Sequence, residues 1–289
     1  MAYGYYPGCS LHATAKEFGI SMRAVCKAFN IELTEVEDWN CCGATPGHTT
    51  KEELGIALPY SNLVNASKQG LENIVAPCAA CYNRLKTADY SVKHSELLKE
   101  RMHSIIGEEK GKDVKIFNIL EFFKDIYGLD RLKAAVKRPL KNLTAACYYG
   151  CLLVRPSKIM QFDDEEDPKS MDEIMSALGA KTVDWSNKTE CCGGSHAIPQ
   201  TNIVLELARK IFSSAEKAGA DCIVVACPLC HANLDMRQQQ INAKYGTKFS
   251  IPVFYITEMI GLALDIKPKE LGMGSHFVDP MKVVSKCEQ

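Results

Sequence analysis

The feature that most constrains this chain is a pair of adjacent cysteines followed by glycine, which occurs twice. The first copy opens the stretch "CCGATPGH" (41–48), and the second opens "CCGGSHAIP" (191–199). Two further blocks recur around them in the same order: "YYPGC" (5–9) with "YYGC" (148–151), and "IVAPCAAC" (74–81) with "VVACPLC" (224–230). Because three blocks repeat in one order, internal duplication is the simplest explanation.

The spacing of the cysteines supports the same conclusion. The first copy reads Cys-x31-Cys-Cys-x35-Cys-x2-Cys and the second reads Cys-x39-Cys-Cys-x34-Cys-x2-Cys. The first gap of the second copy is eight residues longer, and it contains the acidic stretch "FDDEEDP" (162–168). We therefore expect a surface loop at that stretch.

Short apolar runs lead into the cysteines and predict buried strands. These runs are "AYGYY" (2–6), "NIVA" (73–76), "LTAACYY" (143–149) and "DCIVVA" (221–226). Apolar residues then recur at intervals of three and four over residues 203–215, which predicts an amphipathic helix that ends near Gly219. Alternating strands and helices predict an α/β fold of two pseudo-symmetric repeats, each a mostly parallel sheet flanked by helices. The cysteines would lie at the carboxyl ends of the strands, where such sheets bind ligands.

The repeats predict two domains and a tail. We place the boundary in the basic stretch "LKAAVKRPLKN" (132–142), where Pro139 interrupts regular structure. This gives a first repeat domain over residues 1–138, a second over residues 139–266 and a C-terminal tail over residues 267–289, to which we assign no fold.

Composition excludes several classes of protein. A net charge of -1 and a pI near 6.7 offer no general attraction for nucleic acid, and no apolar run reaches the 18 or so residues that span a bilayer. Cys9 lies where a signal peptide would need its hydrophobic stretch, so we expect a cytoplasmic protein. The 14 cysteines then indicate metal binding rather than disulfides.

Each copy offers five thiols, two of them adjacent. A structural zinc site takes four ligands, so five thiols fit zinc poorly. Adjacent side chains diverge and would more easily bind two irons of one cluster, with Gly43 and Gly193 supplying a permissive backbone. Iron–sulfur ligation is therefore favoured, with zinc as the alternative. The ferredoxin run C-x2-C-x2-C-x3-C-P does not occur in the sequence, so electrons would come from another protein.

These motifs resemble the family of proteins with the cysteine-rich CCG domain, and within it the B-type subunits of the methanogenic heterodisulfide reductases. The resemblance covers both repeats and is carried by the doubled motif and the opening "YYPGC". It implies two noncubane [4Fe-4S] clusters, each bound by five cysteines. The implied ligands are Cys9, Cys41, Cys42, Cys78 and Cys81 for one cluster, and Cys151, Cys191, Cys192, Cys227 and Cys230 for the other.

The resemblance also implies an oxidoreductase that reduces the mixed disulfide of coenzyme M and coenzyme B to two thiols in methanogenesis. The two clusters would flank the disulfide and each would take one sulfur. The implied partners are the A-type subunit of the reductase, with flavin and iron–sulfur clusters, and its ferredoxin-like C-type subunit. An electron-transfer CCG protein of another dehydrogenase or quinone reductase is the alternative function, and a zinc-stabilised adaptor is a third.

Four cysteines lie outside the aligned motifs. Cys147 precedes Cys151 by four residues and competes with it as a first ligand, although the "YYGC" alignment favours Cys151. Cys26 and Cys222 lie in a helical and a strand pattern, so we expect buried structural thiols. Cys287 lies in the tail and matches nothing.

Several histidines and basic residues lie near the motifs. His48 and His196 follow their CCG triplets and are candidates for delivering protons, although a loop histidine that bonds its own backbone has the same appearance. We expect His231 to support the second cluster from the first turn of a helix. Basic residues suit the sulfonate, phosphate and carboxylate of the implied substrate, although each one alone is more often a solvated charge. The candidates are Arg84, Lys86, Arg155, Lys188 and Arg237.

Overall fold

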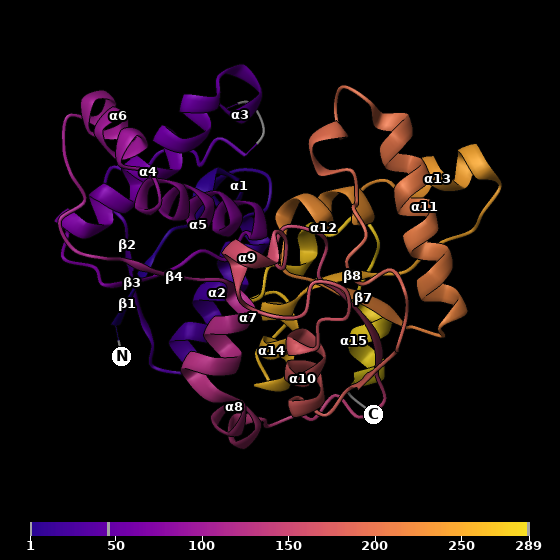
Figure 1. Cartoon of the computed structure of the whole chain (residues 1–289). Coiled ribbons are helices and arrows are strands. Elements are labelled where there is room, and N and C mark those ends of the chain that lie inside the picture. Colours follow the sequence, from indigo (N-terminus) through magenta and orange to yellow (C-terminus); the bar gives the residue numbers. More distant parts are fainter. Residues whose placement is uncertain (1, 45–46, 288–289) are drawn as a thin grey trace.

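Two four-stranded sheets form the framework of the computed structural model, which describes residues 2–44 and 47–287. One sheet belongs to each half of the chain, and the two halves lie side by side (Figure 1). The strand orders are β2-β1-β3-β4 and β6-β5-β7-β8, and every pairing in them is parallel. The two halves therefore share one topology, and the predicted two-repeat α/β fold is confirmed.

The four predicted strands occupy the inner positions of the two sheets. They are β1 (Ala2–Tyr5), β3 (Asn73–Val75), β5 (Thr144–Tyr148) and β7 (Cys222–Val225). Apolar runs of this kind suit strands covered on both faces. The edge strands, which the sequence analysis did not identify, are β2 (Glu32–Glu35), β4 (Lys115–Phe117), β6 (Lys181–Thr182) and β8 (Val253–Tyr255).

Helices cover the sheet of the first repeat. Residues 119–128 divide into a short α-helix and a π-helix. The helices are α1 (Gly8–His12), α2 (Lys16–Ala28), α3 (Gly47–Thr50), α4 (Glu52–Lys68), α5 (Ala79–Lys93), α6 (Glu96–Ile106), α7 (Ile119–Glu121), the π-helix η1 (Phe122–Gly128) and α8 (Leu129–Ala135).

The second repeat is covered in the same way. The predicted amphipathic helix is α11 (Thr201–Lys217), which buries Val204, Ala208 and Ile211. The acidic stretch 162–168 is a mostly exposed loop, as expected. The other helices are α9 (Ser157–Met160), α10 (Ser170–Ala177), the 3-10 helix η2 (Gly194–His196), α12 (Pro228–Asp235), α13 (Gln238–Tyr245) and α14 (Ile256–Ala263).

The repeats pack directly on each other. Helix α2 of the first repeat lies against α14 of the second, where the Oγ of Ser21 and the Oγ1 of Thr257 are 2.7 Å apart. The rings of Phe18 and Tyr255 stack there with centroids 4.2 Å apart. Because this contact joins two cores, it holds the strand ends of the repeats in a fixed relation.

The C-terminal tail, to which the sequence assigned no fold, packs on the second repeat. It contains the 3-10 helix η3 (Met273–Ser275) and helix α15 (Met281–Cys287), and it buries Leu271 and Val284. Within the residues described, no helix is long and apolar enough to cross a membrane.

Candidate functional site

The five aligned cysteines of the first repeat come together beyond the carboxyl ends of β1 and β3. The Sγ atoms of Cys9 and Cys41 are 3.7 Å apart, and those of Cys42 and Cys81 are 3.4 Å apart. The thiols of Cys78 and Cys81 are also hydrogen-bonded. We call these five residues the first cysteine set.

The five aligned cysteines of the second repeat form the equivalent group. The Sγ atoms of Cys192 and Cys230 are 3.5 Å apart. Hydrogen bonds also join Cys151 to Cys191 and Cys227 to Cys230. These five residues are the second cysteine set.

The two sets meet across the boundary between the repeats. The thiols of Cys78 and Cys227, both buried, lie close enough for each to shift the pKa of the other. Close by, the Nδ2 of Asn83 donates to the carbonyl oxygens of Leu152, at 3.0 Å, and Arg155, at 2.7 Å. The sets therefore belong to one site that both repeats build.

Local backbone structure explains why the sets form. Gly43 and Gly193 adopt φ of 71° and 82°, a left-handed conformation that glycine adopts without strain and that turns the chain after each cysteine pair. Cys78 and Cys227 lie at the N-caps of α5 and α12. Each CxxC pair thus spans the first turn of a helix that begins directly after a strand.

Two tyrosines that the sequence analysis did not single out hold the cysteine pairs in place. The hydroxyl of Tyr6 donates to the carbonyl oxygen of Asn40 at 2.7 Å, and that of Tyr148 donates to the carbonyl oxygen of Glu190 at 2.5 Å. Asn40 and Glu190 each precede a cysteine pair. The sequence feature that could have identified these tyrosines is their repetition in "YYPGC" and "YYGC".

Hydrogen bonds among the thiols favour thiolates at particular positions. Bonds with Cys41 and then Cys81 lower the pKa of the Cys42 thiol to about 4. A bond with Cys151 lowers the pKa of Cys191 to about 5, and a bond with Cys230 lowers the pKa of Cys227 well below its ordinary value. Since the thiolate is the form that binds metals, both sets are suited to soft metal ions.

A cavity of about 220 Å³ opens between the repeats beside the second set. All five cysteines of that set line it, together with Arg84 from α5. The guanidinium of Arg84 donates to the carbonyl oxygen of Gly55, while its buried Nε has no hydrogen-bond partner among the residues described. The remaining lining is mostly apolar and consists of Ala44, Ala79, Ala80, Asn83, Tyr149, Leu152, Gly194, Ser195 and Leu229.

The other basic candidates are engaged elsewhere. Lys188 is buried and ion-paired with Asp167 at 3.2 Å. Arg155 pairs with Glu166 at 3.0 Å, and Arg237 donates to the carbonyl oxygen of Ala197 at 3.0 Å. The ammonium of Lys86 lies 5.8 Å from the ring centroid of Tyr82. Arg84 is therefore the candidate that lines the cavity.

The histidine candidates differ in their placement. His196 is exposed at the end of η2. The pKa of Cys191 is lowered mainly by its hydrogen bond with Cys151, less by the backbone N–H groups of Gly193 and Gly194, and least by the charge of His196. The side chain of His48 lies outside the described residues. His231 lies on α12, with its ring stacked on Tyr255 at a centroid distance of 4.2 Å, and its expected role in supporting the second cluster stays a prediction.

The cysteines outside the motifs lie in the cores. Cys147 is buried inside β5, where its neighbours include Asp172 and Cys222, whereas Cys151 contacts Cys191. Geometry therefore favours Cys151 as the member of the second set. Cys26 and Cys222 are buried, as expected, and Cys287 is buried too, in α15 of the tail.

Comparison with known proteins agrees with this site. The family model for the cysteine-rich CCG domain matches residues 3–86 and 145–235. The chain is 34% identical to the B-type subunit of the ferredoxin:CoB-CoM heterodisulfide reductase of Methanosarcina mazei, over 89% of this chain and 87% of that one. It is 29% identical to the 8-methylmenaquinol:fumarate reductase membrane anchor subunit of Wolinella succinogenes, over 97% of this chain and 98% of that one.

A solved structure shares the fold. It is a hypothetical protein from Helicobacter pylori, with a TM-score of 0.77 and 12% identity over 96% of this chain. This chain spans 52% of the length of that protein. At this identity the likeness shows the fold alone.

Proposed function

Because the chain belongs to the family of proteins with the cysteine-rich CCG domain, which includes the B-type subunits of the heterodisulfide reductases, we propose that it is the catalytic subunit of such a reductase. Its substrate is the mixed disulfide of coenzyme M and coenzyme B, as named for its relatives. Two electrons and two protons convert this disulfide into two thiols. One observation carries the proposal: the two cysteine sets approach each other at Cys78 and Cys227, next to a cavity that the second set lines.

The two sets fit iron–sulfur clusters. Each consists of five thiols in mutual reach, none of which takes part in a disulfide, and thiolates are the ligands that such clusters require. In our proposal each set holds one noncubane [4Fe-4S] cluster. When bound, each cluster would supply single electrons at a soft metal centre.

The other residues of the site have simpler tasks. Arg84 offers its positive charge and its free Nε–H to an oxyanion of the substrate, and the apolar lining excludes water around it. His196, next to Cys191, and His48 are the proposed donors of the two protons.

The electrons come from partner proteins in this proposal. The sequence contains no ferredoxin-type cysteine run, and the relatives are subunits of larger reductases. We propose a complex with a ferredoxin-like C-type subunit and a flavin-containing A-type subunit. A cytoplasmic location agrees with a chain in which none of the 14 cysteines, all of them described, forms a disulfide.

A second function is favoured by the similarity to the fumarate reductase anchor subunit, which extends over nearly the whole length of both chains. In that case the clusters would pass electrons between a quinol-linked partner and a further protein of the complex, and the chain would bind no disulfide. The two functions predict the same iron content and differ in substrate.

Anaerobic assays with a reduced viologen and the heterodisulfide test the proposal. The wild-type chain should cleave the disulfide, and Cys42→Ala and Cys192→Ala should each lose both half of the iron and the activity, because each set supplies its own ligands. Cys287→Ala should match the wild type. Appreciable turnover in either set variant would contradict the two-cluster mechanism, and full iron content with no wild-type turnover would favour the electron-transfer function.

A further inference from the structure

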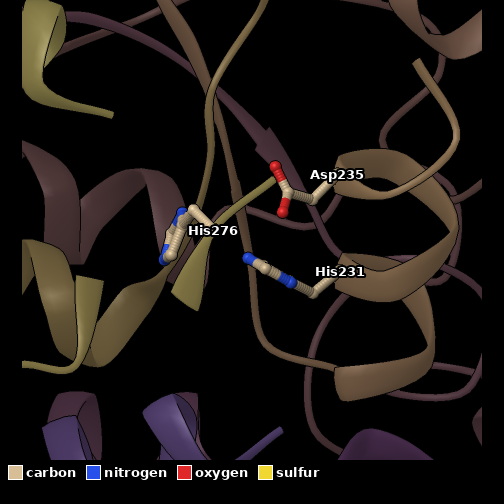
Figure 2. Close-up of side chains that lie close together, drawn as sticks. All are labelled: His231, Asp235 and His276. Atoms are coloured by element: carbon tan, nitrogen blue, oxygen red, sulfur yellow. The ribbon is translucent and has the colours of Figure 1, made fainter. Parts of the chain in front are cut away.

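A second group of metal-binding side chains lies between α12 and the C-terminal tail. His231 and Asp235 are four residues apart on α12, so they share one face of the helix, and His276 of the tail faces them (Figure 2). One potential ligand atom from each residue lies within 4.8 Å of the other two. Tetrahedral ligands of zinc lie about 3.4 Å apart, since each bond is about 2.0–2.1 Å long. Small side-chain shifts therefore close the site.

His276 already has the hydrogen bond that a metal-binding histidine needs. Its Nε2 lies 2.9 Å from the Oε1 of Glu258, and both side chains are completely buried. A carboxylate accepts, so Nε2 carries the proton and donates. The Nδ1 of His276 is buried and has no hydrogen-bond partner in the described part of the chain. Histidine ligands of metal ions commonly donate their second ring nitrogen to a carboxylate in this way.

His231 already has a hydrogen bond on one of its two ring nitrogens. Its Nε2 lies 3.0 Å from the carbonyl oxygen of Val253, to which it donates. A metal ion bound through Nδ1 keeps this hydrogen bond, whereas one bound through Nε2 replaces it.

Three buried carboxyl groups surround the group. The side chains of Asp235, Glu258 and Glu17 are all buried in this region, and burial raises the pKa of each carboxyl. Asp235 accepts from the backbone N–H groups of Phe277 at 2.7 Å and Val278 at 3.1 Å. A bound divalent cation would compensate these carboxylates, which are costly to bury as anions.

An entry path reaches the group from the surface. A cavity of about 220 Å³ is lined by His231 and Asp235 on one side and by Ser275 and Phe277 of the tail on the other. It can supply a solvent molecule as a fourth ligand, as in sites with three protein ligands.

We propose that His231, Asp235 and His276 form a site for a divalent transition metal ion, represented by Zn²⁺, which ties the C-terminal tail to the second repeat. The ligand set of two imidazoles and one carboxylate suits zinc. This site is separate from the cysteine sets and does not depend on the proposed function.

The test uses the full chain with its iron–sulfur clusters, purified anaerobically, equilibrated with Zn²⁺ and desalted against a weak chelator. Zinc and iron are then measured per chain. The wild type should retain about one zinc ion, and His276→Gln and Asp235→Asn should each lower zinc affinity at least about tenfold with iron unchanged. His103→Gln is the matched control, because His103 is half-exposed on α6, and it should behave as the wild type.

Should the variants lose iron because they misfold, a second measurement uses the wild-type protein alone. This measurement is X-ray absorption at the zinc edge. We expect nitrogen and oxygen neighbours at about 2.0–2.1 Å with imidazole scattering, whereas sulfur neighbours at about 2.3 Å would place the zinc on cysteines and overturn the proposal. Failure of the wild type to retain zinc, or equal zinc in folded variants and wild type, would overturn it too.

Discussion

One added methyl group beside a cysteine set should lower the iron content of the protein by more than its loss of thermal stability explains. Gly8 and Gly150 both have a φ of 65° and each lies just before the first cysteine of its set. A Cβ at Gly8 would lie 2.7 Å from the Sγ of Cys81, and one at Gly150 would lie 3.1 Å from the Sγ of Cys230. In Gly8→Ala and Gly150→Ala the neighbouring sulfur must therefore move.

The size of the movement follows from ordinary contact distances. Non-bonded heavy atoms prefer separations of about 3.5–4.0 Å, so the sulfur of Cys81 must shift by about 1 Å and that of Cys230 by about half as much. Binding sites lose function when a ligand is displaced by about that amount. Gly8→Ala should therefore lose most of the iron of the first set, and Gly150→Ala a smaller part of the iron of the second.

Two other glycines provide matched controls. Gly70 and Gly219 adopt φ of 77° and 76°, and no atom of the described residues lies within 4 Å of a Cβ built there. An alanine in this left-handed conformation costs about 1–2 kcal/mol at any of the four positions. The Tm of all four variants should therefore fall by about 2–4 °C for each kcal/mol of this conformational cost. Calorimetry would measure the fall.

Iron per chain, measured after anaerobic purification, decides the prediction. Gly70→Ala and Gly219→Ala should keep the full iron content despite their lower Tm, because they carry the backbone cost without the contact. Full iron in Gly8→Ala, or equal iron loss in Gly8→Ala and Gly70→Ala, would refute the reasoning.

Three further predictions concern single side chains. Arg84→Met should raise the KM for an anionic disulfide about 10- to 100-fold with little change in kcat, because a charge-assisted hydrogen bond contributes about 1.5–3 kcal/mol; an unchanged KM would exclude Arg84 as the anion partner. Burial, opposed by Lys86, raises the pKa of Glu121 to about 7, so its protonated form stabilises the fold fully below about pH 4.5, and this stabilisation is lost as the pH rises through 7. At pH 8, Glu121→Gln should therefore raise the Tm and increase the free energy of unfolding by at most about 3 kcal/mol, whereas at pH 5 both should change little. An equal gain in Tm at both pH values would contradict this. Tyr148→Phe leaves the carbonyl oxygen of Glu190 without its donor, so it should cost about 1–3 kcal/mol in thermal unfolding and reduce iron retention, whereas a variant with wild-type Tm and iron would show that the bond is dispensable.

Local patterns were sufficient to predict most of the framework. The apolar runs before the cysteines predicted the four central strands, because a strand covered on both faces must be apolar throughout. Two of the missed edge strands lack such a run: β2 has the sequence "ELTE" and is partly exposed, and β6 is two residues long. Their pairing depends on the neighbouring strand rather than on their own composition.

The contacts that build the site across the two repeats could not be predicted. The approach of Cys78 to Cys227 joins residues that are far apart in the sequence, and so does the hydrogen bond that Asn83 donates to Leu152. The meeting of His231 and Asp235 with His276 depends on where the tail packs. Such contacts follow from tertiary packing, which no local pattern records.

The convergence of the cysteine sets does not by itself distinguish the two candidate functions. Passing single electrons between centres requires closeness, and so does delivering two electrons to one disulfide, so the contact of Cys78 and Cys227 serves either task. Arg84 distinguishes them, because a half-buried cation whose buried Nε–H is unpaired, in an otherwise mostly apolar cavity, suits an anionic substrate and gains nothing from a neutral quinol. The effect of Arg84 substitutions on substrate affinity is therefore a sharper test of function than the loss of any cysteine.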